Sequence, residues 1–215
     1  MAKNFILILG GARSGKSTFA QDIAPKLGGK VLFVATAEPL DSEMASRIEH
    51  HKRTRPENWR TLEIGIEVGQ KLKDQIKDSD AVLLDCLTLL VSNILTKEDT
   101  EPSFDYTPPP LHHDEHPPSH HCEDSTTCHC KERSDEAISR AENRVMTEME
   151  ALIKCIDKHK GTFIVVSNEV GLGLVPDNKL GRIYRDLLGR ANQLLAQHAS
   201  EVYFMASGIP LKIKG

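Results

Sequence analysis

Residues 10–17 combine glycines, a lysine and a serine at the spacing of a phosphate-binding loop. They read Gly-Gly-Ala-Arg-Ser-Gly-Lys-Ser and lie between an apolar run at 5–9 and a helix-like stretch. Glycines let backbone N–H groups turn toward an anion, Lys16 adds a positive charge, and the Ser17 hydroxyl is a suitable Mg²⁺ ligand. The flanking strand and helix disfavour a chance match to a Gly-rich turn. We therefore predict a P-loop that binds a nucleoside triphosphate.

Acidic residues follow two further apolar runs. Asp85 closes the run 81–84, and Glu169 follows the run 163–167. A carboxylate at a strand end beside a P-loop can hold Mg²⁺ opposite Ser17, and we predict this role for Asp85; a helix N-cap is a compatible alternative. Glu169 is a candidate substrate contact or general base. The glycines after it belong to a loop that closes over a substrate or to a plain connecting turn.

The segment 41–56 carries a second chemical signal. Met44, Ile48 and His51 recur at spacings of four and three residues, which predicts one apolar helix face that includes His51. A histidine on such a face is commonly a core residue. The cationic residues at 52–55 follow directly and form either a solvated helix end or a phosphate-binding cluster. Because a P-loop is present in the same chain, we favour phosphate binding.

Short apolar runs alternate with longer amphipathic stretches, which is typical of a parallel sheet covered by helices. Strands are expected at 4–9, 31–36, 81–85, 162–167, 201–206 and 209–213. Helices are expected at 16–26, with a kink or an end near Pro25, and at 42–54, 65–77, 86–96, 135–159 and 178–198. Ligands of such sheets bind at the carboxyl ends of the strands. The residues expected beside the P-loop are therefore Ala35, Thr36, Ala37, Asp85, Asn168 and Glu169.

Composition fits one α/β domain over 1–215, since the 215 residues include 39% apolar side chains. The 27 Lys and Arg against 31 Asp and Glu give a net charge of −4, which provides no general attraction for nucleic acid or an anionic membrane. The first strand is too short to span a bilayer. We expect a cytoplasmic protein without membrane insertion.

The stretch 97–133 lacks helical or strand periodicity and is expected to be a mobile insertion in the domain. Its histidines and cysteines could hold a soft transition metal such as zinc, nickel or cobalt, although their spacing matches no standard zinc module. A merely polar insert is the alternative. The candidate ligands are His112, His113, His116, His120, His121, Cys122, Cys128, His129 and Cys130.

Other sequence blocks occur in a fixed order with the P-loop. They are Ala-Thr-Ala at 35–37, Asp-Ser-Glu-Met-Ala-Ser-Arg-Ile-Glu-His-His-Lys at 41–52, Arg-Pro at 55–56, Trp-Arg-Thr at 59–61, Asn-Glu-Val-Gly-Leu-Gly-Leu-Val-Pro at 168–176 and Ser-Gly-Ile-Pro-Leu-Lys at 207–212. In these blocks the chain resembles the bifunctional adenosylcobinamide kinase and adenosylcobinamide-phosphate guanylyltransferase family of cobalamin biosynthesis. The resemblance implies a RecA-like P-loop fold with a mostly parallel sheet and a reversed C-terminal strand, assembled as a homotrimer.

The resemblance also implies an activity and its residues. ATP or GTP phosphorylates the aminopropanol hydroxyl of adenosylcobinamide, and GMP is then transferred from GTP to adenosylcobinamide phosphate, with release of pyrophosphate. His51 would carry the GMP, Lys16 would assist catalysis, and Ser17 and Asp85 would hold Mg²⁺. Members often have Glu where this chain has Asp85. The side chain that would reach Mg²⁺ is therefore one methylene shorter here. The implied nucleotide contacts are Gly10, Gly11, Ala12, Arg13, Ser14, Gly15, Lys16, Ser17, Ala35, Thr36, Ala37, Lys52, Arg53, Thr54, Arg55, Glu63 and Asp85.

Two other functions fit parts of the sequence. A P-loop GTPase metallochaperone for nickel or cobalt also joins a P-loop to a His-rich stretch. Its guanine-reading motif is Asn/Thr-Lys-x-Asp, and the nearest match, Asn-Lys-Leu-Gly at 178–181, lacks the aspartate. A family member that retains only the kinase activity is the second alternative, which the presence of His51 disfavours.

Overall fold

The computed structural model describes residues 4–39, 42–53, 55–97 and 126–215. The elements are β1 (Phe5–Gly10), α1 (Lys16–Ile23), the 3₁₀ helix η1 (Ala24–Leu27), β2 (Val31–Ala35), α2 (Ser42–Arg53), β3 (Arg60–Glu63), α3 (Val68–Lys71), β4 (Ala81–Asp85), α4 (Leu87–Thr96), α5 (Thr126–Lys158), β5 (Thr162–Val166), α6 (Lys179–His198), β6 (Glu201–Ala206) and β7 (Ile209–Lys214). They form a seven-stranded sheet in the order β3-β2-β4-β5-β1-β6-β7. All neighbouring strands are parallel except β6 and β7. The predicted α/β fold with a reversed last strand is confirmed.

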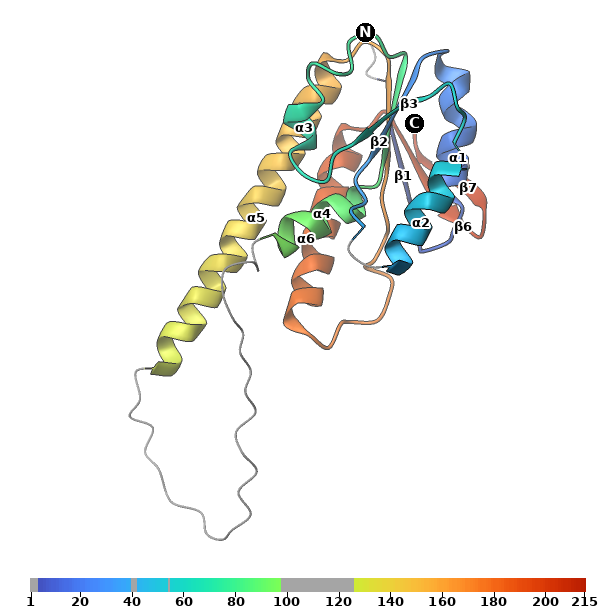
Figure 1. Cartoon of the computed structure of the whole chain (residues 1–215). Coiled ribbons are helices and arrows are strands. Elements are labelled where there is room, and N and C mark those ends of the chain that lie inside the picture. The colour runs from blue at the N-terminus through green and yellow to red at the C-terminus, as the bar shows by residue number, and fades with distance from the viewer. Residues whose placement is uncertain (1–3, 40–41, 54, 98–125) are drawn as a thin grey trace, which may run out of the picture.

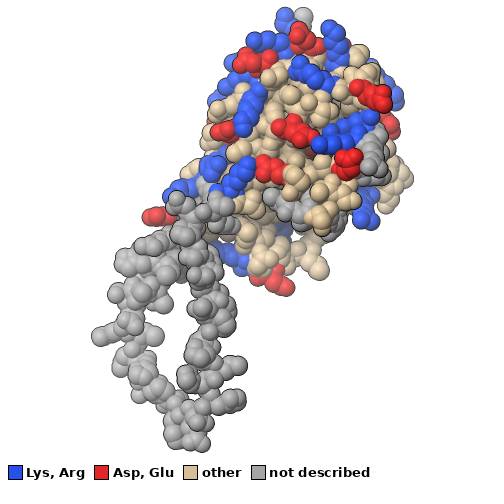
Figure 2. All heavy atoms as spheres, in the orientation of Figure 1, with Lys and Arg blue, Asp and Glu red and all other residues tan. Residues whose placement is uncertain are grey.

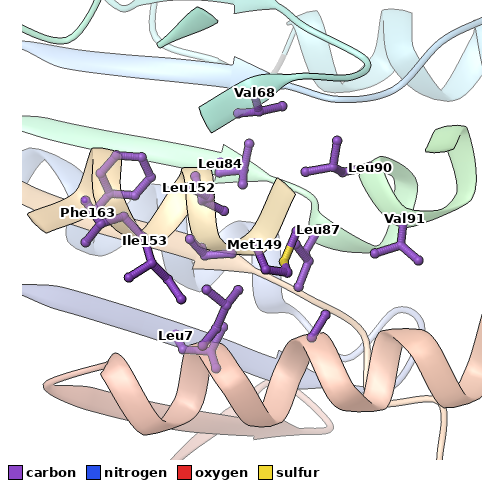
Figure 3. Packing of buried hydrophobic residues seen from close by; sticks show 14 of the residues in the cluster. Leu7, Val68, Leu84, Leu87, Leu90, Val91, Met149, Leu152, Ile153 and Phe163 are labelled. Atoms are coloured by element: carbon purple, nitrogen blue, oxygen red, sulfur yellow. The ribbon is translucent and has the colours of Figure 1, made fainter. Parts of the chain in front are cut away.

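Helices cover both faces of the sheet (Figure 1). Helices α3, α4, α5 and α6 lie on one side, and α1 and α2 lie on the other side in this view. Because both faces are covered, β1, β2 and β5 are buried at every residue, which explains their continuous apolar sequences. Alternate residues serve the two faces: Leu7 packs with the α5 side, as Figure 3 shows, whereas Ile8 belongs to the opposite core with Phe33.

The strand order sets the line of residues at the carboxyl edge. Strand β5 lies between β1 and β4, so the P-loop strand and the Asp85 strand are separated by one strand, in a RecA-like arrangement. Val166 pairs in register with Ile8 on one side and with Asp85 on the other. The P-loop, the segment after β5, Asp85 and Ala35 therefore follow one another along this edge.

Between β2 and β4, one strand was not predicted and one predicted helix was wrong. The strand β3 was missed because it is a short edge strand of four residues with three exposed side chains, so no apolar run marks it. The predicted helix 65–77 is only the four-residue α3 followed by turns. A Cβ atom on Gly69 would lie 2.4 Å from backbone atoms of Ala151 and Leu152, so close docking on α5, which sequence periodicity does not encode, shapes this segment.

One predicted helix boundary is confirmed and another was wrong. The first helix ends at Ile23 and η1 follows with Pro25 near its start, which confirms the expected kink or end near Pro25. Helix α5 begins at Thr126, not at 135, so the part of the expected loop at 126–133 is helical. Extending a helix that is already formed costs far less than starting one, which allows a sequence of weak periodicity to continue it. The rest of the insertion, at 98–125, lies outside the described residues.

Charge is mixed on the face shown in Figure 2, where Lys and Arg lie among Asp and Glu. Within the described ranges, no helix is long and apolar enough to cross a membrane.

Candidate active site

A cleft of 770 Å³ lies at the carboxyl edge of the sheet. Its walls come from the P-loop, the ends of β2, β3, β4 and β5, the start of α4, and α2. The lining residues are Ala12, Arg13, Ser14, Gly15, Lys16, Ser17, Thr18, Phe33, Ala35, Ala37, Ile48, Arg55, Glu63, Asp85, Cys86, Thr88, Leu89, Val166 and Asn168. Most of the predicted nucleotide contacts are thus brought to one cavity. Gly10, Gly11, Thr36 and Lys52 lie outside its lining.

The P-loop is supported by the C-terminal hairpin. Gly10 has φ 151° and Gly15 has φ 90°, backbone conformations that favour glycine. The N–H of Gly208, in the turn between β6 and β7, donates to Ser14 O at 3.0 Å. The Ser-Gly block at 207–208 therefore holds the loop from behind, a contact that the sequence did not reveal.

Lys16 is 7% exposed and lies against its own loop. Its Nζ donates to Gly11 O at 2.5 Å and to Ser14 Oγ at 3.4 Å. Burial lowers the pKa of Lys16, and the nearby acidic groups at 85 and 86 oppose that shift. The ammonium is thus held at the loop where a phosphate would be received.

Asp85 and Ser17 line the same cleft. Asp85 ends β4 in register with Ala35, and Ser17 is the second residue of α1. Hard oxygen ligands in a phosphate-binding cleft suit Mg²⁺. The next residue, Cys86, is a free thiol whose pKa is raised to about 12, mainly by burial, so it is neutral at physiological pH.

Thr36 supports the cleft through hydrogen bonds to the backbone next to Asp85. It is fully buried, and its hydroxyl donates to Cys86 O at 2.6 Å and accepts from Cys86 N at 2.9 Å. The side chain of Asn93 in α4 donates to Thr36 O at 2.8 Å. These bonds join the ends of β2 and β4, which positions the backbone beside Asp85.

Arg55 forms a cationic wall of the cleft. Its guanidinium carbon lies 3.8 Å from the centroid of the Phe33 ring, a cation–π contact. Burial lowers the pKa of Arg55, and Asp85 and Glu63 oppose this shift. Lys52 instead pairs with Glu63 at 2.6 Å, through two side chains that are about half exposed.

Helix α2 borders the cleft through Ile48. His51 lies three residues further along the same helix. The side chains of His51 and Arg53, and the whole of Thr54, lie outside the described residues.

Glu169 lies in a different cavity from the P-loop. A cleft of 550 Å³ contains Glu169, Gly171, Arg185 and Arg190 beside α6. One Glu169 carboxylate oxygen accepts from Gly171 N at 2.8 Å. The preceding residue, Asn168, lines the P-loop cleft instead.

Most candidate metal ligands of the insertion, at 112–122, lie outside the described residues. Positions 128–130 belong to the first turns of α5, and their side chains are not described. Within the described ranges, no group of three or more His, Cys, Asp or Glu side chains could hold a metal.

Known proteins resemble this chain over almost its whole length. The family described as cobinamide kinase / cobinamide phosphate guanyltransferase matches residues 6–213. The bifunctional adenosylcobalamin biosynthesis protein CobU of Escherichia coli is 38% identical over 209 residues, covering 97% of this chain and 99% of that protein. The corresponding CobP of Pseudomonas aeruginosa is 34% identical, covering 97% and 96%. The crystal structure of the RadB recombinase superposes with a TM-score of 0.45 at 14% identity, covering 94% of this chain and 74% of that one. The chain belongs to the cobinamide kinase / cobinamide phosphate guanyltransferase family.

Proposed function

We propose that this chain phosphorylates the aminopropanol hydroxyl of adenosylcobinamide with ATP or GTP and then transfers GMP from GTP to the new phosphate. Family membership supports both activities. The observation that carries the proposal is the single cleft in which a P-loop, Asp85, Arg55 and helix α2 meet. One triphosphate site beside the helix that contains His51 can serve both reactions.

Phosphate binding is assigned to the loop and its cationic neighbours. The backbone N–H groups of the P-loop and the start of α1 would contact phosphoryl oxygens, and Lys16 and Arg55 would balance their charge. Ser17 and Asp85 fit an Mg²⁺ ion, since both offer oxygen atoms to the same cleft. The ion would supply charge stabilisation on the phosphates.

Guanylyl transfer is assigned to His51. With an ordinary pKa near 6.5, about 90% of a histidine is neutral at pH 7.5 and carries a free lone pair. A ring nitrogen would attack the α-phosphorus of GTP, forming a P–N bond as the P–O bond to pyrophosphate breaks. An oxygen of adenosylcobinamide phosphate would then attack the same phosphorus and break the P–N bond, which frees His51.

The kinase step requires no covalent intermediate. An acceptor hydroxyl placed in line with the γ-phosphate attacks it, and the nucleoside diphosphate leaves. Glu169 was the sequence candidate for the base. Because it lies in the second cavity, we retain it only as a candidate substrate contact.

Further properties follow from the resemblance. We propose a cytoplasmic homotrimer that acts on adenosylcobinamide and its phosphate and not on nucleic acid. We also propose that the insertion binds a transition metal, which its histidines and cysteines support. Family membership favours the transferase over a GTPase metallochaperone.

The deciding experiment incubates the protein with Mg²⁺ and GTP labelled at the α-phosphate, then denatures it. We expect an acid-labile, alkali-stable label that His51→Ala removes and that the matched variant His50→Ala retains. A His51→Ala protein that still phosphorylates adenosylcobinamide would separate the two activities. Full GMP transfer by His51→Ala would refute the assigned nucleophile, and absence of label in the unmodified protein would favour the kinase-only alternative.

A further inference from the structure

The hydrogen-bond ladder between β5 and β1 continues past the last residue of β5. Ser167 N donates to Ile8 O at 2.9 Å, and Glu169 N donates to Gly10 O at 3.0 Å. Side chains on an extended segment alternate between its two faces. Val166 and Asn168 line the P-loop cleft, whereas Glu169 lines the cavity beside α6. The residue after β5 that serves the nucleotide cleft is therefore Asn168.

The backbone of Asn168 is held from two helices. Its N–H donates to Thr88 Oγ1 at 2.9 Å, and its carbonyl accepts from Asn192 Nδ2 at 3.0 Å. Its side-chain amide makes no hydrogen bond with the part of the chain that the structure describes. Since both backbone groups are engaged, the amide is the polar group that Asn168 offers to the cleft.

Buried polar groups fix this arrangement. Asn192 is 4% exposed and Ser167 is fully buried, and the Ser167 hydroxyl donates to Asn192 Oδ1 at 2.7 Å. Desolvating such groups is costly unless they are hydrogen-bonded, and here each is. A satisfied buried network has one preferred geometry. Asn192 thus holds Asn168 through its carbonyl.

The position of Asn168 matches the place of the transferred phosphate. Because β5 separates β1 from β4, Asn168 lies along the sheet edge between the P-loop and Asp85. An amide N–H can donate to a phosphoryl oxygen without the repulsion that a carboxylate would introduce. Phosphoryl transfer depends mainly on such positioning.

We propose that Asn168 orients the γ-phosphate of the bound triphosphate for transfer, through a hydrogen bond from its side-chain amide, and that Asn192 is the positioning residue that holds it. The inference rests on the proposed function, because it assumes a triphosphate in the P-loop cleft. The sequence patterns already predicted Lys16 and Asp85 as residues of the nucleotide site. The inference adds Asn168 as a residue that contacts the terminal phosphate.

The first test compares Asn168→Ala and Asn168→Asp with the unmodified protein. A hydrogen bond to a charged group is worth about 1.5–3 kcal/mol. Asn168→Ala, which removes the amide, should therefore lower kcat for phosphoryl transfer by about 10- to 150-fold. We expect Asn168→Ala to lose much of the preference for a non-hydrolysable triphosphate over the diphosphate, with unchanged diphosphate affinity. Asn168→Asp should lose more, because its charge repels the phosphate. Asn143→Ala, an exposed asparagine on α5, is the matched control.

The second test concerns Asn192. We expect Asn192→Ala to lower kcat per folded molecule with little change in the KM for nucleotide, and Ser167→Thr, which keeps the hydroxyl, to retain more activity than Ser167→Ala. A purely structural role would lower the melting temperature and leave kcat per folded molecule unchanged, which would overturn the positioning role.

The outcomes also separate this inference from the proposed function. Triphosphate binding without cobinamide phosphorylation would contradict the proposed substrate, and the nucleotide-preference measurement would still test Asn168. An unchanged preference in Asn168→Ala would overturn the inference even if both proposed activities are present.

Discussion

The two adjacent glycines that open the P-loop should respond very differently to alanine. A Cβ atom on Gly10 would lie 2.6 Å from Met205 O and 2.8 Å from Ser14 Oγ. The first neighbour is backbone of β6 and cannot rotate away. Around Gly11, by contrast, a Cβ atom would meet nothing within 4 Å.

The magnitude follows from two effects at Gly10. Its φ of 151° is rarely adopted by residues with a side chain, and such backbone strain costs about 1–3 kcal/mol. Overpacking against β6 adds about 1–3 kcal/mol. We therefore expect Gly10→Ala to lose about 2–6 kcal/mol of stability, which lowers the melting temperature by about 4–24 °C in a protein of this size.

Calorimetric melting of Gly10→Ala, Gly11→Ala and the unmodified protein measures the difference. Gly11→Ala should melt within a few tenths of a kcal/mol of the unmodified protein, since it meets no neighbour. Nucleotide titration should show weaker binding to Gly10→Ala, because a displaced strand end misaligns the loop amides. Equal melting temperatures for the two variants would refute the reasoning, whether or not both differ from the unmodified protein.

Three further predictions concern the cleft, the core and the insertion. Replacing Arg55 with alanine should weaken triphosphate binding and remove the contact with Phe33, which is worth about 1–2 kcal/mol of stability. Replacing Arg55 with lysine should restore part of the binding but not the stacking. Nucleotide titration measures the binding, and thermal melting measures the stability. Burial raises the pKa of Glu148, whose carboxylate accepts a hydrogen bond from Gly69 N at 2.9 Å. The folded protein is therefore stabilised by protonation of Glu148 below pH 4.5, the ordinary pKa, and this stabilisation is lost as the pH rises through the raised pKa. Glu148→Gln keeps the acceptor without the charge and should melt at least as high at pH 7, with the difference vanishing below pH 4.5; a much lower melting temperature at pH 7 would contradict this. Deleting 98–125 should abolish calorimetric binding of Zn²⁺, Ni²⁺ or Co²⁺ and leave nucleotide affinity unchanged, and absence of metal binding by the full chain would contradict the metal proposal.

Most of the fold could be predicted because each core strand can be recognised from its own consecutive residues. Strands β4 and β6 have the predicted bounds, and the others in the core differ by one residue at either end. Their burial on both faces produces continuous apolar runs, which a reader of the sequence can see. The strand β3 carries no such run, since an exposed edge strand needs no apolar residues. Helix α3 likewise depends on the docking of Gly69 against α5.

The candidate site was predictable in its motif and not in its assignments. The P-loop, Asp85 and the cationic residue Arg55 were identified because each has a local signal, and they line one cleft. Thr36 was expected in the same place, but its hydroxyl is bonded to the backbone of Cys86. Asn168 had no signal of its own beyond its place after a strand.

The sequence by itself determined the nucleotide-binding motif, the order of strands along the chain and the family, because these depend on neighbouring residues. Only the tertiary structure decided that Gly208 supports the P-loop, that Gly10 and not Gly11 is closely packed, and that Asn168 and Glu169 serve different cavities. The physical reason is that these choices depend on the order of strands in the sheet and on contacts between distant segments. Local periodicity states which residues share a face, and it does not state what packs against that face.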